Sequence, residues 1–435
     1  MIDALAPTNF AISNPKVIKE MFESNGENLV RGLDKLLHDI ERSKNVLSIS
    51  TTDVGAFTIG KNIAASKGKV IFQNDLMQLI HYKPLLKQVF SRPILVIPPW
   101  INRFYILDLS KQNSLVNWLL NMGYNVFMIS WVNPTKEHAQ KDFSDYMQEG
   151  PLAAFSAMTE ATGSKEVLAI GYCLGGTLLA STAAYMAKKK DTRLKSASFM
   201  ATLIDFEDGG DLSIFVDDEQ LKIIEKKMAA EGYLDGSEMS ATFSLLRSND
   251  MIWSYIINNY MLGKDPIPFD ILHWNADCTR MPAYMHSFYL RNMYQKNLLI
   301  KPNGISLAGV KIDVSKIEIP CYFLAAKDDH IVPWQSSYAA TQVIKNSTFV
   351  LSSSGHVAAI INSPAQNKYC HWHNSKLKDT AEEWNKSAKE VAGSWWPNWH
   401  KWQEKLAGKL VPAIDPGQGK LKAIENAPGS YVLQE

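Results

Sequence analysis

The sequence contains no uninterrupted run of about 18 apolar residues, so it predicts no membrane-spanning helix. Its four cysteines lie far apart and form no Cys-x-x-Cys pair, which argues against a zinc site and a disulfide framework and fits a reducing cytoplasm. Neither sign of charge is in excess, and the net charge of +1 offers no electrostatic reason to bind nucleic acid. The first residues also lack the basic and apolar stretches of a secretory signal, so we expect a cytoplasmic protein.

What the 435 residues do contain is an alternation of strand and helix patterns. Short apolar runs rich in β-branched residues predict buried strands, and segments with helical spacing separate them. The strand runs lie within residues 91–100, 125–131, 165–172, 195–206, 317–326 and 347–354. Strands that alternate with helices imply an α/β fold with a mostly parallel sheet and helices on both faces.

Two segments depart from this alternation, so the sequence predicts three parts of the protein. Residues 1–88 are polar with apolar positions at helical spacing, so we expect an N-terminal helical segment. Residues 205–300 are helical, aromatic and irregular, and we interpret them as a cap inserted over the carboxyl edge of the sheet, where ligands bind in such folds. The catalytic core is then expected to comprise residues 89–204 and 301–435.

The stretch "IGYCLGGT" at 170–177 has the form of the nucleophile turn of α/β-hydrolases, with Cys173 in the place of serine. Gly171 and Gly175 permit a tight strand-to-helix turn that exposes the central side chain above the sheet. The start of the following helix favours a thiolate, and the backbone N–H of Leu174 is placed to bind an oxyanion. A buried structural cysteine in a glycine-rich loop is the alternative interpretation of this motif alone.

An acid and a histidine follow in the chain order that α/β-hydrolases use. Asp328 and Asp329 come directly after the predicted strand "CYFLAA", and His356 comes after "TFVLSSS". An aspartate pair in a solvated turn and a histidine capping a helix are the alternatives for each motif taken singly. The coincidence of all three, in order and at strand ends, indicates an α/β-hydrolase fold with a Cys-His-Asp triad.

A cysteine nucleophile suits acyl transfer. Thiolate is a stronger nucleophile than a serine hydroxyl at neutral pH. An acyl group passed from one thioester to another stays activated, whereas an oxygen ester would be more stable and harder to transfer. The motif therefore favours an acyltransferase that uses thioester substrates.

Several stretches together resemble the polyhydroxyalkanoate synthases, most closely the class I type that acts on short (R)-3-hydroxyacyl-CoA. The resemblance covers nearly the whole chain. It is carried by "PPWINRFYILDL" (98–109), "SWVNP" (130–134), "GYCLGGT" (171–177), "KDDHIVPW" (327–334), "SSSGHVAAIINSP" (352–364) and "GSWWPNW" (393–399). Members usually have a longer N-terminal region, so residues 1–88 are interpreted as the remnant of one.

The resemblance implies roles for particular residues. Cys173 matches the nucleophile of the family, His356 the general base, and Asp329 the catalytic aspartate. The aspartate is thought to help activate the 3-hydroxyl of the incoming substrate, besides any role in orienting the histidine. The backbone N–H groups of Ile101 and Leu174 match the two donors of the oxyanion hole.

The resemblance also implies partners and location. The expected reaction polymerises (R)-3-hydroxyacyl-CoA, such as 3-hydroxybutyryl-CoA, into polyhydroxyalkanoate with release of CoA. No cofactor or metal is expected, because coenzyme A is part of the substrate. The expected partners are the growing polyester chain, the surface of its granule in the cytoplasm, and a second copy of the chain in a homodimer.

Two other functions are compatible with parts of the pattern. An intracellular depolymerase or thioesterase could use the same triad on the same fold and would release a soluble acid. A non-catalytic granule-surface protein could keep the fold as a scaffold, although the intact triad argues against it. Release of CoA together with an insoluble product distinguishes the synthase from both.

Overall fold

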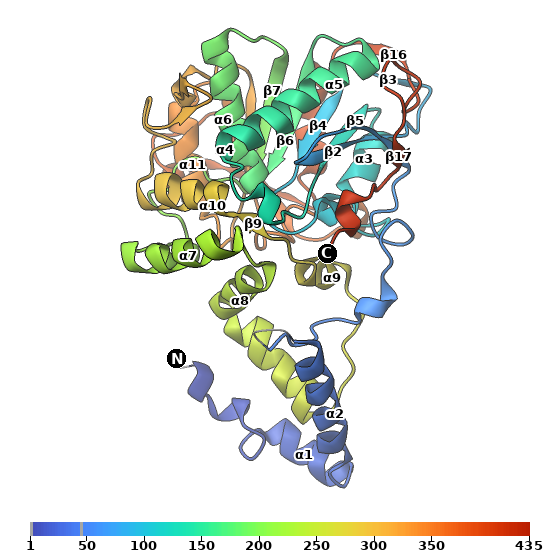
Figure 1. Cartoon of the computed structure of the whole chain (residues 1–435), viewed down its shortest axis with the longest axis vertical. Helices are drawn as coiled ribbons and strands as arrows, with labels where there is room; N and C mark the ends of the chain where they lie inside the picture. Colours follow the sequence, from blue (N-terminus) through green and yellow to red (C-terminus); the bar gives the residue numbers. More distant parts are fainter. Residues whose placement is uncertain (1–2, 44–46) are drawn as a thin grey trace. The chain divides into compact units, whose positions relative to one another are not determined.

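The computed structural model describes residues 3–43 and 47–435 and divides into two compact units. One unit comprises Met1–Thr58 and Asp235–Cys278, and the other Ile59–Leu234 and Thr279–Glu435. Both are seen in Figure 1, where the larger unit contains the sheet and the smaller one contains the N-terminal helices. The division into an N-terminal segment, a core and a cap, with boundaries near residues 88, 205 and 300, stays a prediction.

The larger unit is built on one mixed sheet whose strands lie in the order β15-β14-β13-β12-β7-β6-β4-β5-β2-β1-β17. Strands β13, β12, β7, β6, β4 and β5 are parallel, and antiparallel strands extend the sheet on both sides. The bounds are β1 Gly68–Gln73, β2 Met77–Tyr82, β4 Ile94–Ile97, β5 Val126–Trp131, β6 Val167–Tyr172, β7 Leu194–Met200, β12 Cys321–Ala326, β13 Ser347–Ser352, β14 Cys370–His373, β15 Lys389–Ala392 and β17 Glu425–Asn426. The predicted mostly parallel sheet is confirmed.

Continuous apolar runs form the central strands because helices bury both faces of the sheet. Strands β4, β5, β6 and β12 are buried at every position. The helices of this unit are α3 Leu115–Asn121, α4 Phe143–Met147, α5 Ala153–Thr162, α6 Leu174–Lys189, α7 Asp218–Glu231, α10 Ala283–Tyr289, α11 Trp334–Val343, α12 Ala381–Ser387 and α13 Trp396–Gln403. Short strands pair outside the main sheet: β3 Gln88–Phe90 with β16 Leu410–Pro412, β8 Tyr233–Leu234 with β9 Met281–Pro282, and β10 Ser306–Leu307 with β11 Val310–Lys311.

The expectation that residues 1–88 are helical is correct for α1 (Pro15–Glu23) and α2 (Glu27–Arg42) but wrong for residues 68–82. Those residues form the hairpin of β1 and β2 in the main sheet. The physical reason is that strand-forming residues lie on both sides of a turn. The side chain of Asn74 accepts hydrogen bonds from the backbone N–H of Leu76 and Met77, and this closes the turn.

In the smaller unit, α2 packs against a π-helical stretch at Ile256–Met261, and α8 (Gly236–Leu246) and α9 (Asp270–Ala276) complete it. Gly32 is required in α2, because an added Cβ would lie 1.8 Å from the carbonyl oxygen of Tyr260. Asp39 is buried beside that contact. Burial would raise its pKa, but hydrogen bonds from Ser50 and Tyr260 lower the pKa overall. Among the described residues no helix combines the length and apolar content that a membrane span requires.

Candidate active site

Cys173 lies at the turn between β6 and α6. Its backbone has φ 52° and ψ −122°, a conformation that residues other than glycine rarely adopt. Gly171 must be a glycine, since an added Cβ would lie 2.5 Å from the Cα of Gly176. An added Cβ on Gly175 would lie 2.1 Å from the carbonyl oxygen of Ile97, at the end of β4. The predicted strand–turn–helix around Cys173 is confirmed.

The two glycines of the turn predict different responses to substitution. Gly175→Ala meets backbone oxygen that cannot move, so we expect the free energy of unfolding to fall by about 3 kcal/mol. Gly176→Ala meets the side chain of Thr202, 2.0 Å from Oγ1, and should be partly rescued by Thr202→Ala. Urea unfolding of Gly175→Ala and Gly176→Ala, each with and without Thr202→Ala, measures the loss and the rescue of stability. An equal rescue of Gly175→Ala by Thr202→Ala would contradict the assignment.

Asp329 and His356 lie beside each other in loops that follow β12 and β13. Nδ1 of His356 is 2.6 Å from Oδ2 of Asp329. Oδ1 of Asp329 accepts hydrogen bonds of 2.9 Å from the backbone N–H groups of Ile331 and Val332. The carboxylate is wholly buried and both of its oxygens are engaged, so it holds the imidazole in one orientation.

The electrostatics of His356 join the three predicted residues. Burial alone would lower the pKa of the imidazole, because it disfavours the charged form. The charges of Asp329 and Cys173, together with the hydrogen bond to Asp329, outweigh burial and raise the pKa well above its usual value. The site therefore stabilises a protonated histidine between a carboxylate and the sulfur, which is the state that follows proton transfer from the thiol.

Asp328 takes no part in this arrangement. Its side chain is exposed, and its backbone N–H donates to the carbonyl oxygen of Ser354 at 3.0 Å. Of the two adjacent aspartates, only Asp329 is buried and hydrogen-bonded to His356.

Aromatic residues that sequence reasoning did not assign to the site support the histidine. The ring of Tyr172 lies 5.5 Å from that of His356, and its hydroxyl donates to the His356 carbonyl oxygen at 3.4 Å. The indoles of Trp395 and Trp396 donate to the carbonyl oxygens of Ala359 and Ile360 at 2.7 and 3.0 Å. These bonds fix the segment after His356 and explain the first two tryptophans of "GSWWPNW".

A tyrosine pair lies within electrostatic range of Cys173. The rings of Tyr289 and Tyr294 are 5.4 Å apart, and both contact Phe206. Burial raises the pKa of both hydroxyls, and the charge of Cys173 raises it further, so both remain neutral. Two buried tyrosine side chains therefore lie near the sulfur.

The loop that carries Ile101 reaches the same turn. It begins at the end of β4, where the carbonyl oxygens of Ile97 and Pro98 face Gly175 at the start of α6. The hydroxyl of Thr279 donates to the carbonyl oxygen of Trp100 at 2.7 Å. Leu174 is the first residue of α6, so its N–H lies at a helix N-terminus with no partner from within the helix. The structure thus places both predicted oxyanion donors on segments that meet at the turn.

Two family models match the chain. The model described as the N-terminus of poly-beta-hydroxybutyrate polymerase (PhaC) matches residues 1–119. The model of the alpha/beta hydrolase fold matches residues 94–363, which cover β4 through the loop of His356. The predicted α/β-hydrolase fold is confirmed.

Solved structures also align with parts of this chain at low identity. They include a monoacylglycerol lipase from Paleococcus ferrophilus, which is 12% identical with a TM-score of 0.40 over 64% of this chain and 90% of the lipase. A bromoperoxidase from Bacillus anthracis is 13% identical with a TM-score of 0.34 over 68% of this chain and 95% of that chain.

Several poly(3-hydroxyalkanoate) polymerases match almost the full length of this chain. Poly(3-hydroxyalkanoate) polymerase subunit PhaC of Rhizobium meliloti is 48% identical over 99% of this chain and 70% of its own length. Poly(3-hydroxyalkanoate) polymerase of Methylorubrum extorquens is 46% identical over 99% of this chain and 72% of its own. The PhaC subunit of Cupriavidus necator is 39% identical over 99% of this chain and 74% of its own. With such identity over these lengths, the chain belongs to the poly(3-hydroxyalkanoate) polymerase family of acyltransferases.

Proposed function

We propose that this chain polymerises short (R)-3-hydroxyacyl-CoA through a thioester on Cys173. The observation that carries the proposal is the position of His356, which is hydrogen-bonded to buried Asp329 and lies close enough to Cys173 for the charge of that residue to raise the pKa of the imidazole. Within a polymerase family, this arrangement supplies a nucleophile, a base and an orienting carboxylate at the carboxyl ends of the parallel strands β6, β12 and β13.

The first step of the proposed reaction loads the enzyme. His356 takes the proton of the Cys173 thiol, and the sulfur attacks the carbonyl carbon of the acyl-CoA thioester. The backbone N–H groups of Leu174 and Ile101 stabilise the oxyanion of the tetrahedral intermediate. The carbon–sulfur bond to CoA then breaks, and CoA leaves with the proton from His356.

The second step extends the polymer. The 3-hydroxyl of a hydroxyacyl unit attacks a chain thioester, while His356, held by Asp329, accepts the hydroxyl proton. An oxygen ester forms and a thiol is released. Water must be kept away from the thioester, because hydrolysis would end the chain. The buried aromatic side chains near Cys173 suit this requirement, and the chemistry needs no metal or further cofactor.

The experiment that tests this function follows thiol release and turbidity after mixing the protein with (R)-3-hydroxybutyryl-CoA. We expect CoA release and an insoluble polyester together. CoA release with a soluble acid as the only product would point to a thioesterase, and no CoA release at all would favour a non-catalytic scaffold.

The acyl range gives a sharper prediction. The resemblance to class I synthases and the buried Trp100 and Trp131 favour substrates of four to six carbons, and we expect a four-carbon substrate to be preferred over a ten-carbon one. Each methylene changes selectivity by only about 1–3 kcal/mol, so the test needs direct competition between the two. Gas chromatography of the hydrolysed polymer measures incorporation. Equal incorporation would overturn the short-chain assignment and leave the polymerase assignment intact.

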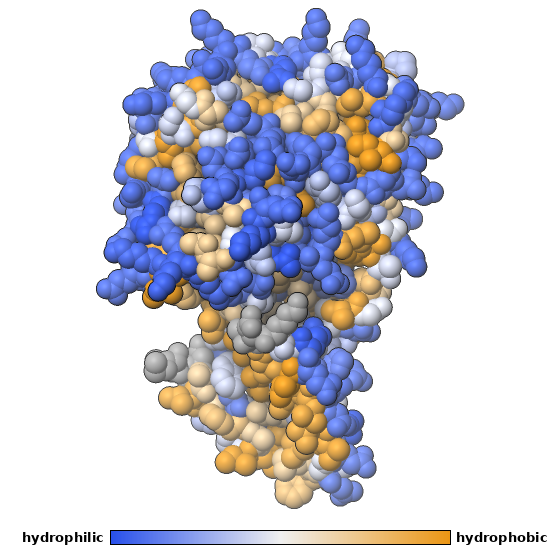
Figure 2. Space-filling model, in the orientation of Figure 1, coloured by the Kyte–Doolittle hydropathy of each residue, from blue (hydrophilic) through white to orange (hydrophobic). Residues whose placement is uncertain are grey.

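Association with the polyester granule in the cytoplasm is part of the proposal. Helix α2 exposes Val30, Leu33, Leu37 and Ile40 at helical spacing, and Figure 2 shows apolar side chains gathered on this unit. Acidic and basic residues are mixed on the rest of the helix, which suits a neutral ester surface better than an anionic membrane. We expect Leu33→Asp to weaken co-sedimentation of the protein with polyhydroxybutyrate granules.

The homodimer is a separate part of the proposal. Light scattering, which measures the mass of the protein in solution, tests it.

A further inference from the structure

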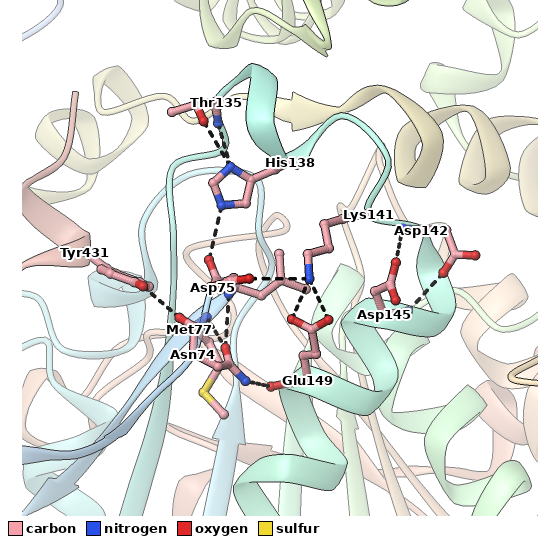
Figure 3. Close-up of polar contacts among 11 residues, drawn as sticks. Asn74, Asp75, Met77, Thr135, His138, Lys141, Asp142, Asp145, Glu149 and Tyr431 are labelled. Atoms are coloured by element: carbon pink, nitrogen blue, oxygen red, sulfur yellow. Dashed lines mark hydrogen bonds and ion pairs between the residues drawn. The ribbon is translucent and has the colours of Figure 1, made fainter.

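The last residues of the chain are anchored on the β1–β2 hairpin of the larger unit. Strand β17 pairs with β1, with Glu425 opposite Val70 and Asn426 opposite Lys69. Beyond β17, the hydroxyl of Tyr431 donates to the carbonyl oxygen of Asn74 at 2.7 Å, as Figure 3 shows. This segment therefore has a fixed path along the sheet edge and ends at the hairpin turn.

The anchor is rigid, because the same turn is tied to the segment that follows β5. The side-chain amide of Asn74 donates to the carbonyl oxygen of Glu149 at 2.7 Å, and Lys141 bonds both carboxylate oxygens of Glu149 (Figure 3). Nε2 of His138 lies 3.2 Å from the carbonyl oxygen of Asp75. Tyr431 thus docks on a frame that hydrogen bonds hold from several sides.

From this anchor the chain reaches the loop of Ile101. Arg103, which is only 6% exposed, donates from Nη1 to the carbonyl oxygen of Tyr431 at 3.3 Å and from Nη2 to that of Gln434. Arg103 follows Ile101 by two residues. Asn102 between them has a positive φ of 62°, so a tight bend couples the two positions.

A second set of contacts joins the same parts. Arg280 donates from Nη1 to the carbonyl oxygen of Glu435 at 3.1 Å, and its backbone N–H donates to Oδ1 of Asn133 at 2.9 Å. The adjacent Thr279 holds the carbonyl oxygen of Trp100. The loop Trp100–Arg103 is thus fastened at its start by Thr279 and at its end by the last residues of the chain.

We propose that Arg103 is a positioning residue, which uses residues 431–435 as a brace to set the loop that presents the Ile101 N–H to the oxyanion. The inference rests on the proposed function, since it assigns a purpose to that N–H. An oxyanion donor acts only when it lies about 2.7–3.1 Å from the developing charge. A displacement of this loop by a fraction of an ångström is therefore expected to lower kcat while substrate binding is preserved.

The experiment compares Arg103→Gln, Arg103→Lys and a chain that ends at Leu433. We expect Arg103→Gln to lower kcat for CoA release from (R)-3-hydroxybutyryl-CoA by about tenfold to a hundredfold with KM nearly unchanged. Arg103→Lys keeps a charged donor and should recover part of the loss. The shortened chain lacks the Gln434 carbonyl and should lose a similar factor, and the shortened chain with Arg103→Gln should lose no more than either alone.

Arg92 provides the matched control. It precedes β4 as Arg103 follows it, and it also donates to a backbone carbonyl oxygen of the C-terminal region, that of Leu406 at 2.7 Å. Arg92→Gln should lower the melting temperature without changing kcat. Thermal melts of every variant identify those that do not fold, and Arg103→Lys and the shortened chain then decide.

The outcomes separate the inference from the proposed function. Losses of kcat that multiply in the combined variant, or a raised KM with normal kcat, would overturn the brace and indicate that Arg103 contacts substrate. Wild-type kcat in Arg103→Gln would also overturn it. If the unaltered protein releases no CoA, or if Cys173→Ser is fully active, the proposed function itself fails.

Discussion

Replacing Cys173 with serine should abolish polymerisation and lower kcat by about a thousandfold or more while leaving the fold intact. The two side chains are similar in size, so the strained turn between β6 and α6 should accept serine. A serine hydroxyl, however, is far harder to ionise than a thiol, and its acyl product is an oxygen ester that transfers poorly to the next hydroxyl. Circular dichroism measures the fold, and CoA release measures the rate.

The remaining cysteines are the controls for this variant. Burial raises the pKa of the thiols of Cys321 and Cys370, which disfavours the nucleophilic thiolate form of both. Replacing Cys278, Cys321 or Cys370 with alanine should preserve kcat, with some loss of stability for Cys321 because it is buried in β12. Wild-type CoA release by Cys173→Ser, or loss of activity in a folded control, would show that another group is the nucleophile.

Asp329→Asn should have the second largest effect, slowing acylation of Cys173 and elongation by about a hundredfold or more. One carboxylate oxygen accepts two backbone N–H bonds, so an asparagine would keep its oxygen there and turn its NH₂ group toward His356. Nδ1 would then have to accept, and the proton would sit on Nε2, which is the wrong tautomer for removing a proton from Cys173. Rapid-quench measurement of the CoA burst, with intact mass of the protein, follows both steps.

The neighbouring residue tests whether the effect belongs to position 329. Asp328→Asn removes the same charge from an exposed side chain and should leave kcat within about twofold. A normal CoA burst in Asp329→Asn, followed by a stable acyl-enzyme, would mean that Asp329 serves only to activate the 3-hydroxyl. A missing burst agrees with the orienting role that the 2.6 Å contact supports.

Local sequence patterns predicted the centre of the fold better than its edges. Strands β4 and β6 are short, apolar and buried on both faces, so their composition alone identifies them. Strand β17 has only two residues, and it forms because β1 lies beside it. No local pattern records a pairing between residues more than 350 positions apart. The residues of the β1–β2 hairpin have a composition typical of strands, but the helical spacing of the residues before them led to a helical prediction for the whole of residues 1–88.

The candidate site divides in the same way. Cys173, Asp329 and His356 could be predicted because the strand-end positions and the chain order of the triad are local and ordered features. The sequence shows that Tyr172 precedes Cys173 but does not predict its contact with His356. That contact depends on how β6 and the loop after β13 meet. Similarly, nothing near Arg103 in the sequence indicates that its partners are Tyr431 and Gln434.

The pairing of β1 with β17 has a consequence for the protein during its synthesis. Residues 68–73 leave the ribosome long before their partner strand at residues 425–426. Until then the outer edge of β1 presents unpaired N–H and C=O groups, and such an edge can pair with another chain. Cys173, Asp329 and His356 have all emerged before that edge is covered. A nascent chain therefore already contains the three candidate catalytic residues while aggregation still competes with folding, and this period ends only when residues 425–426 have emerged.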